Sequence, residues 1–470
     1  MKSRIALLIP IIFVSNLYAD TNVNWEFVLQ NVHKNYPLIL KQQEELNSAV
    51  AETQAATGAF DSYLSSKHDE RLSGFYDGKV TSLQAVKPLS FLNSEVGLGA
   101  RKSDRNFPIY EGKNDTLDDG ELFAKIKLSL LQNRDIDDNR SNLRQKKVKE
   151  EIKRIEFRQK QLEAQQKATS TYWKWFYSLQ NKRITNELYD LAIKRQEMFE
   201  KKFKAGDTSK LKLLENNQYI YKRKALLESA KLEELNARID LSLWLWNDKG
   251  EKYTHESLNH LPEEKFKVIP RDTIPENLLA NNPLVDILNK EIMYYEINQE
   301  IGENKLMPKL DLTYDYSDDR GNGSKTLQGA EHRVMLELKI PLERDLGKGK
   351  IASAKSKINA KNLELVYLKN QLKLYFFKYQ AMMQTLINNH ETYMNEVKLA
   401  KKLVTAEKRQ FEAGQSSLFM INIREEKQAE SEVKAWKALY EYYTALGNFL
   451  TFANKKIESP KDLEKLAQTN

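Results

Sequence analysis

One seven-residue pattern occurs twice in this chain, and it constrains the fold more than any other feature. Residues 203–209 (FKAGDTS) return 208 positions later as residues 411–417 (FEAGQSS). Two weaker matches keep the same order in both halves: Asn35 and Pro37 with Asn281 and Pro283, and the pair Arg134-Asp135 with Arg344-Asp345. Ordered self-similarity of this kind indicates a tandem duplication. Because the offsets differ, the first half holds about 36 to 38 more residues between Pro37 and Arg134.

Each half contains one very long helical segment and a shorter return segment. We expect helices over residues 138–204 and 209–246 in the first half, and over residues 348–412 and 416–452 in the second. Glycine and proline are scarce, at 17 and 11 of 470 residues, so long helices need not be interrupted. A helix of about 65 residues is on the order of 100 Å long. That length suits a coiled coil or a tube rather than a globular domain.

Two of the return segments carry apolar residues at steps of three and four. The first set is Leu232, Leu235, Ile239, Leu243 and Trp246, and the second is Trp436, Tyr440, Tyr443, Gly447 and Leu450. This spacing is typical of a coiled-coil seam. Gly447 within a seam predicts the close approach of a neighbouring helix backbone.

Four segments within residues 61–132 and 308–342 alternate between apolar and polar side chains. In one of them, Leu310 and Leu312 lie on the face opposite to Asp311. Such alternation fits a lipid-facing strand, and it fits a half-buried strand of a soluble sheet equally well. The additional residues of the first half fall in 61–132, where we expect an extracellular excursion that includes Gly74 to Lys87. Residues 114–120 and 321–323 are expected to be loops.

The N-terminus predicts export. Lys2 and Arg4 precede an apolar run from Ile5 to Val14, and Ala19 is a suitable last residue of a secretory signal peptide over residues 1–19. The apolar run is too short to span a bilayer, and no later stretch holds 18 apolar residues. If the chain enters a membrane, only a closed β-barrel would satisfy its backbone groups. The export signal and the long helices favour the barrel interpretation of the alternating segments.

The residue types argue against an enzyme, a cofactor or a nucleic acid as partner. Cysteine is absent, the six histidines are scattered, and no metal-ligand spacing occurs. The net charge of +8 is spread over helical segments of mixed sign, without a basic stripe. Residues 347–350 (GKGK) lack the spacing of a phosphate loop and are expected at a strand-to-helix junction. The aromatic cluster at 172–177 predicts helix packing rather than a ligand platform.

Together these motifs resemble the TolC-like outer-membrane efflux protein family over essentially the whole chain after the signal peptide. The resemblance rests on the two F-x-A-G-x-x-S turns, the N-x-P openings at 35 and 281, residues 340–347 (IPLERDLG) and the closing residues 445–447 (ALG). It implies an α+β membrane protein of two tandem repeats that forms a homotrimer. Each subunit would give four strands to a twelve-stranded β-barrel, continued by a long α-helical coiled-coil barrel.

The resemblance also implies a location and partners. The barrel would contact lipid in the outer membrane of a Gram-negative bacterium, and the helices would form a periplasmic tunnel. A periplasmic adaptor and an inner-membrane pump, either ABC-type or proton-driven, would dock at the helical tips. The tip residues expected to meet the adaptor are Phe203, Ala205, Gly206, Ser209, Phe411, Ala413, Gly414 and Ser417. A helix C-cap alone also explains a glycine at each turn.

The tunnel gate departs from the family pattern. Members of the family can close the tunnel with an acidic pair at positions that match Met420 and Ile423, and neither residue is acidic here. The nearby polar residues are therefore the candidates for a constriction: Asn422, Glu425, Lys212 and Glu215.

These observations predict a division of the chain and a function. The first repeat would cover residues 20–246, the inter-repeat linker 247–283, the second repeat 284–456 and a C-terminal tail 457–470. The expected function is a passive exit duct for an efflux or type I secretion system. The alternative is a periplasmic coiled-coil scaffold or adaptor, which would need no apolar strand faces.

Overall fold

The computed structural model describes residues 23–104, 107–108, 111, 114–258, 282–459 and 461–462. The expected signal peptide lies outside these residues, as do most of the expected linker and tail. The chain divides into two compact units, and each draws segments from both halves of the sequence. The helical unit comprises the described parts of Met1–Lys41, Gln159–Asn281 and Leu372–Asn470, and the strand unit comprises those of Gln42–Arg158 and Asn282–Gln371.

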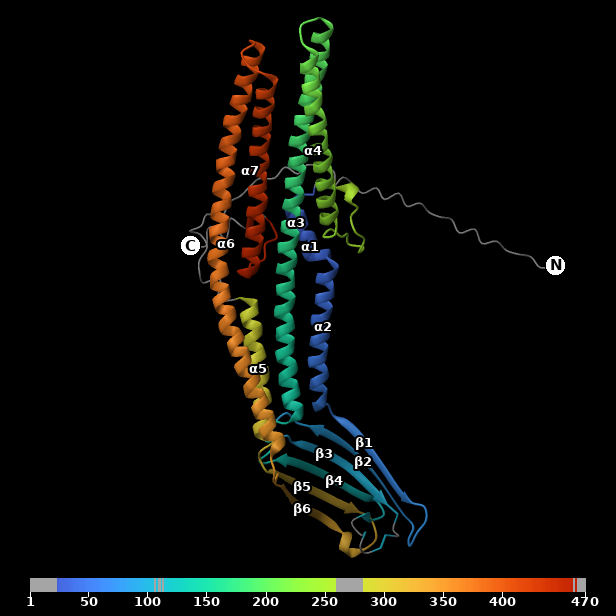
Figure 1. Cartoon of the computed structure of the whole chain (residues 1–470). Helices are drawn as coiled ribbons and strands as arrows, with labels where there is room; N and C mark the ends of the chain where they lie inside the picture. The colour runs from blue at the N-terminus through green and yellow to red at the C-terminus, as the bar shows by residue number, and fades with distance from the viewer. Residues whose placement is uncertain are drawn as a thin grey trace, which may run out of the picture. The chain divides into compact units, whose positions relative to one another are not determined.

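The strand unit contains one antiparallel sheet whose strands lie in sequence order, β1-β2-β3-β4-β5-β6 (Figure 1). The strands are β1 Tyr63–Arg71, β2 Gly78–Pro88, β3 Glu95–Ser103, β4 Gly120–Ser129, β5 Lys309–Arg320 and β6 Gly329–Lys339. The β4–β5 pairing joins the two halves of the sequence, with Ile126 opposite Tyr314. The expected loops at 114–120 and 321–323 meet at one end of the sheet, where the Asp118 N–H donates to the Asn322 carbonyl at 3.2 Å.

The sheet has six strands, two more than the four per subunit that the family resemblance implies. Most of the expected excursion over Gly74 to Lys87 is strand β2, which begins at Gly78 and pairs with both β1 and β3. On one face of β2 only Leu83 and Ala85 are apolar, between Thr81 and Lys87. The alternation is therefore too weak to be read from the sequence. The additional residues of the first half form the β1–β2 hairpin.

The two faces of the sheet differ in charge. We call apolar the face that bears Leu64, Leu83, Leu98, Leu122, Leu312 and Leu336, and charged the opposite face. On the charged face Arg101 pairs with Glu121 at 2.5 Å. Asp311 is buried there and accepts a hydrogen bond from the Ser129 hydroxyl at 2.9 Å. The alternation predicted from the sequence is confirmed for β3 to β6.

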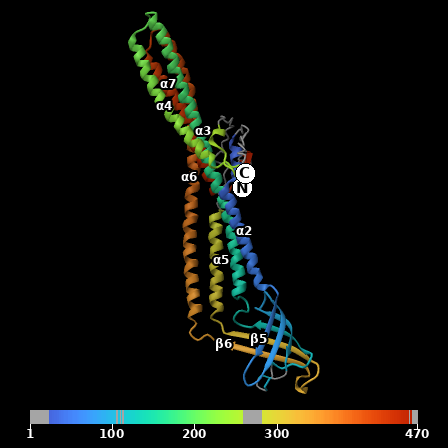
Figure 2. The same cartoon turned by 90° about the vertical axis from the view of Figure 1, so that its right-hand side faces the viewer.

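Two helices of the strand unit pack very closely. Helix α5 (Pro283–Asn304) and the first part of helix α6 (Asp345–Glu412) lie side by side in both views (Figure 1 and Figure 2). A Cβ built on Gly302 would lie 2.8 Å from Ile351 Cγ1, and one on Gly347 would lie 2.5 Å from Leu306 Cδ2. Glycine is therefore required at this crossing. Residues 347–350 belong to the first turns of α6, so the expected strand-to-helix junction is confirmed.

The helical unit is built on two helical hairpins. One joins α3 (Asp138–Lys204) to α4 (Lys210–Ser242), and the other joins α6 to α7 (Leu418–Phe452). Two further helices lie near the N-terminus: α1 (Trp25–Asn35) in the helical unit, and α2 (Pro37–Thr57), most of which lies in the strand unit. The bounds of α3 are those predicted from the sequence. Among the helices of the described residues, none is long and apolar enough to cross a membrane.

Aromatic side chains form the core of the helical unit. Trp173 of α3 stacks on Tyr443 of α7 with ring centroids 3.8 Å apart, and Trp25 of α1 packs edge-on against both. The Trp25 indole donates a hydrogen bond to the Thr169 hydroxyl at 3.2 Å. Tyr172 and Trp175 are fully buried. The prediction that the cluster at 172–177 packs helices is confirmed.

The two predicted seams have different outcomes. In α7, Tyr443, Gly447 and Leu450 are buried, and Gly447 lies against the backbone of Gln166 in α3. The predicted seam of α4 makes no internal contact along its length, since Leu232 and Leu243 are 59% and 52% exposed. The buried face of α4 instead follows a second set at the same steps: Leu227, Ala230, Glu234, Ala237 and Leu241. Helix α4 is therefore apolar on two faces, and one copy of the chain covers only one of them.

Replacing Gly302 with alanine tests the close crossing of α5 and α6. The new methyl group would clash with the backbone nitrogen of Ile351, 3.0 Å away, and we expect a loss of about 1–3 kcal/mol in stability. Gly349→Ala is the matched control, because nothing lies within 4 Å of its Cβ position and alanine favours a helix by up to about 1 kcal/mol. Thermal unfolding followed by circular dichroism should separate the two variants. Equal melting temperatures would contradict the packing.

Candidate functional site

The repeated seven-residue pattern forms the same turn at the end of both helical hairpins. Gly206 and Gly414 have positive φ angles of 80° and 74°. At the first turn the Gly206 N–H donates to the Phe203 carbonyl at 3.0 Å, and the Asp207 N–H donates to the Lys202 carbonyl at 2.8 Å. This pair of bonds is the Schellman motif, in which a glycine in the left-handed conformation ends a helix.

The second turn repeats these bonds at equivalent residues. The Gly414 N–H donates to the Phe411 carbonyl at 3.0 Å, and the Gln415 N–H donates to the Gln410 carbonyl at 2.8 Å. Ser417 then caps α7 by accepting a hydrogen bond from the Met420 N–H at 3.3 Å. The expected C-cap role of both glycines is therefore present, and it holds both turns in one geometry.

The phenylalanine side chains of the two turns differ in their exposure to solvent. Ala205, Ser209 and Ala413 are exposed, as is Phe203 at 44%. Phe411 is half-buried, because its ring packs edge-on against Phe199 of α3 and lies under the Lys212 ammonium. No atom lies within 4 Å of the Cβ position of either glycine. The backbone of both turns is therefore open to a partner.

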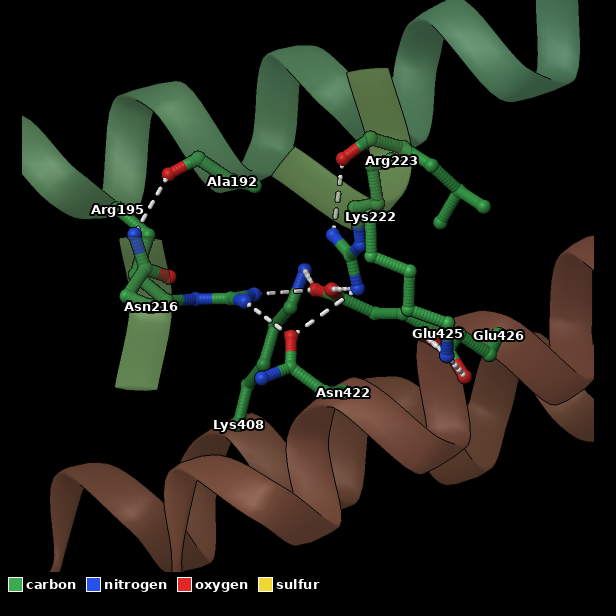
Figure 3. A network of polar contacts seen from close by, with 10 residues as sticks. Ala192, Arg195, Asn216, Lys222, Arg223, Lys408, Asn422, Glu425 and Glu426 are labelled. Carbon is green, nitrogen blue, oxygen red and sulfur yellow. Dashed lines mark hydrogen bonds and ion pairs between the residues drawn. The ribbon is translucent and has the colours of Figure 1, made fainter. Parts of the chain in front are cut away.

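A buried cluster of charges joins the two hairpins a short way along the helices from these turns (Figure 3). Arg195 of α3 donates to Glu425 of α7 at 2.6 Å and to Asn422 of α7 at 2.8 Å. Arg223 of α4 donates to the same carboxylate at 3.1 Å and to the same Asn422 oxygen at 3.0 Å. Glu425 and Asn422 are 3% and 0% exposed, and Arg223 is 0% exposed.

This cluster has more positive than negative charge. Two buried guanidinium groups share the single Glu425 carboxylate, and Lys408 of α6 approaches it at 3.4 Å. Burial lowers the pKa of Arg223, and Glu425 partly opposes that shift. Arg223 also donates to the Leu188 carbonyl at 2.8 Å. Buried charges are costly unless they are paired. Glu425 and Asn422 therefore offset the free-energy cost of burying both arginines at this junction.

Weaker polar contacts surround the cluster. Asn216 of α4 is fully buried and donates to the Ala192 carbonyl at 3.0 Å. Lys222 pairs with Glu426 at 2.8 Å in a contact open to solvent. Closer to the second turn, Glu407 accepts hydrogen bonds from the Ser416 hydroxyl and from Arg424. The hydrogen bond from Ser416 is the main reason that the pKa of Glu407 lies below its ordinary value.

The structure separates the four residues expected at a constriction. Asn422 and Glu425 lie together inside the protomer and contact Arg195 and Arg223, so their side chains line no surface of a single copy. Lys212 is exposed, and Glu215 is half-buried.

Sequence reasoning missed Arg195 and Arg223. Both lie in highly charged segments, such as Tyr221 to Lys224, that look like solvated helix faces. One signal was available for Arg223, because it lies four residues before Leu227 and so continues the buried face of α4. No local signal marks Arg195, whose partners lie 227 and 230 positions away in the sequence.

No family model matches this sequence, and no curated protein matches it either. Solved structures do match. The Campylobacter jejuni CmeC outer membrane channel is similar over 94% of this chain and 89% of that chain, with 12% identity and a TM-score of 0.64. For the outer-membrane channel OprN the shares are 93% and 91%, with 12% identity and a TM-score of 0.65. For the Neisseria gonorrhoeae MtrE outer membrane channel in its open state they are 92% and 89%, with 10% identity and a TM-score of 0.62.

These matches define the class of fold. The chain has the fold of outer-membrane channels over more than nine-tenths of its length. The TolC-like resemblance predicted from the motifs is therefore confirmed at the level of the fold.

Replacing Glu425 with glutamine tests the buried cluster. The change leaves two buried arginines without a carboxylate, and we expect the junction of α7 with α3 and α4 to weaken by about 3 kcal/mol. Local opening should then expose the lysine-rich hairpins, so that trypsin cleaves the folded protein at least about tenfold faster. Glu426→Gln is the matched control, since its partially exposed pair with Lys222 contributes about 0–1 kcal/mol. Equal cleavage rates for the two variants would contradict the assignment.

Proposed function

We propose that this protein is the subunit of an outer-membrane channel that serves as a passive exit duct. The observation that carries the proposal is the shared fold with outer-membrane channels over more than nine-tenths of the chain. The separation of apolar and charged faces in the sheet supports it, because a barrel wall needs one face for lipid and one for water. The duct needs no catalytic group, since a pump would supply the energy. Its location would be the outer membrane, with the helices in the periplasm.

The channel is proposed to be a homotrimer. Apolar side chains remain uncovered along α4 and α6, including Leu232, Leu243, Leu363, Tyr367, Leu374 and Phe377, each more than half exposed. Contiguous apolar surface on a soluble helix marks a contact with another chain. The exposed set on α4 has coiled-coil spacing, so the natural partner is a helix of a second copy. Copies arranged in a ring would cover these stripes on every subunit.

The two turns are proposed to be the docking points for a periplasmic adaptor and, through it, an inner-membrane pump. The backbone around Gly206 and Gly414 is open, and both turns have one geometry. A trimer would therefore present six similar tips in a ring. The last turn of α3 adds the exposed lysines Lys201, Lys202 and Lys204, which would attract acidic groups on the adaptor.

The buried cluster is proposed to hold the tips of one subunit together in the resting state. Movement of α7 away from α3 and α4 would separate Glu425 from Arg195 and Arg223, which leaves buried charges unpaired. Opening would therefore need work from a docked partner. In this account Asn422 and Glu425 control the tunnel by joining the hairpins rather than by lining it, whereas Lys212 and Glu215 stay candidates for the lining.

Fractionation with heat-modifiable gel migration separates the duct from the alternative, a periplasmic scaffold or adaptor. We expect the protein in outer-membrane fractions as a species that runs as a trimer in unheated samples and as a monomer after boiling. The expected cause is a closed, hydrogen-bonded barrel that resists detergent until heated. A soluble periplasmic monomer would rule out the duct and favour the scaffold.

Engineered cysteines test the tips. The chain has no native cysteine, so Asp207→Cys and Gln415→Cys each provide one thiol for a short crosslinker. We expect adducts with one periplasmic protein from both variants, because the two turns share a geometry. Asp240→Cys, exposed on α4 well away from the turns, should give no such adduct. Failure of both tip variants to capture a periplasmic protein would count against adaptor docking.

A further inference from the structure

The sheet has two long edges that the chain itself leaves unpaired. Within the described residues, β1 pairs only with β2 and β6 pairs only with β5. The strands have 9 and 11 residues, and every residue of β6 is exposed. Natural proteins seldom leave so long an edge open in water, and an open edge is not tolerated in lipid.

A short uncharged run on β1 and on β2 lies on the same face as the apolar residues of β3 to β6. On the apolar face of β1, Leu64 and Ser66 are uncharged and Glu70 lies near the end of the strand, while Lys67 and Asp69 lie on the charged face. On the apolar face of β2, the uncharged run Thr81, Leu83 and Ala85 is flanked by a lysine at each end, Lys79 and Lys87. Lysines at the borders of an apolar band can extend their ammonium groups to water.

The register carries this uncharged belt across the sheet without a break. Leu64 lies opposite Ala85, which lies opposite Leu98. The belt continues through Ala124 and Tyr316 on β4 and β5. On β6 it includes Val334, Leu336 and Leu338, which are 65%, 64% and 58% exposed. All six strands therefore contribute uncharged residues to one band on the same face of the sheet.

We propose that β6 of one copy pairs with β1 of the next, so that all six strands of each copy belong to the barrel wall. This inference rests on the proposed trimeric channel, in which three copies would give eighteen strands. An even number of antiparallel strands per copy leaves β6 antiparallel to the neighbouring β1, which closes the sheet without a parallel seam. Barrel diameter grows roughly linearly with strand number, so the lumen would be about 1.5 times as wide as that of a twelve-stranded barrel. The narrowest part of the duct then lies among the helices.

Disulfide trapping tests this seam. Val334→Cys on β6 is combined in turn with Leu64→Cys, Ser66→Cys or His68→Cys on β1, all on the apolar face. We expect at least one combination to give covalent dimers and trimers under oxidation, and no single variant to do so. The competing arrangement leaves β1 and β2 out of the wall and pairs β6 with β3. In that arrangement Val334→Cys would instead give covalent dimers and trimers, here called a ladder, when combined with Val96→Cys, Leu98→Cys or Ala100→Cys on β3. A β3 ladder, or a heat-labile trimer without any β1 ladder, overturns the proposal but leaves the channel function intact.

A charge placed on β1 gives an independent test with a matched control. Ser66→Arg places a guanidinium on the apolar face, where lipid would surround it. Ser65→Arg places the same group on the charged face one residue away. We expect Ser66→Arg to reduce the heat-labile trimer in the outer membrane by at least about tenfold, and Ser65→Arg to leave it nearly unchanged. Equal trimer levels for the two variants would mean that β1 does not face lipid. Loss of all trimer in the parent protein would instead refute the channel itself.

Discussion

Apolar surface on more than one side of very long helices is the constraint on which the rest of this structure depends. Helix α4 buries Leu227, Ala230 and Leu241 against its own chain and leaves Leu232 and Leu243 exposed. A pair of helices can cover one stripe on each member, and a second stripe needs a further helix. The long hairpins therefore keep apolar stripes that their own chain does not cover, and the sheet likewise keeps edge strands that its own chain does not pair. Both features are satisfied at once if copies of the chain close around an axis.

The buried charge cluster adds specificity to helix packing that is otherwise adaptable. Apolar seams with steps of three and four can slide or rotate at modest cost, whereas Arg195 and Arg223 meet Glu425 in only one arrangement of α3, α4 and α7. Buried ionic groups of this kind can fix register. The same property makes the junction a two-state element, because the pairs are either formed or broken. A duct that must stay closed until a partner docks needs an element of this type.

Much of the fold was predictable because it depends on local patterns. Helix α3 begins and ends at the predicted Asp138 and Lys204, and the repeated turns around Gly206 and Gly414 follow from helix-capping chemistry. Three features were not predictable, each for a physical reason. The β1–β2 hairpin is nearly as polar on one face as on the other, so its alternation is weak. The internally buried stripe of α4 was missed because two stripes with the same spacing coexist on that helix. The Arg195–Glu425 pair depends on tertiary proximity across 230 residues.

The central claim is that copies of this chain close around an axial channel. Electron microscopy of the full-length protein, purified in detergent and reconstituted in lipid nanodiscs, tests it most directly. We expect three copies around one axis, with an opening that continues from the sheet in the lipid into a tube of helices. A monomeric particle, or a solid helical bundle without an axial opening, would contradict it.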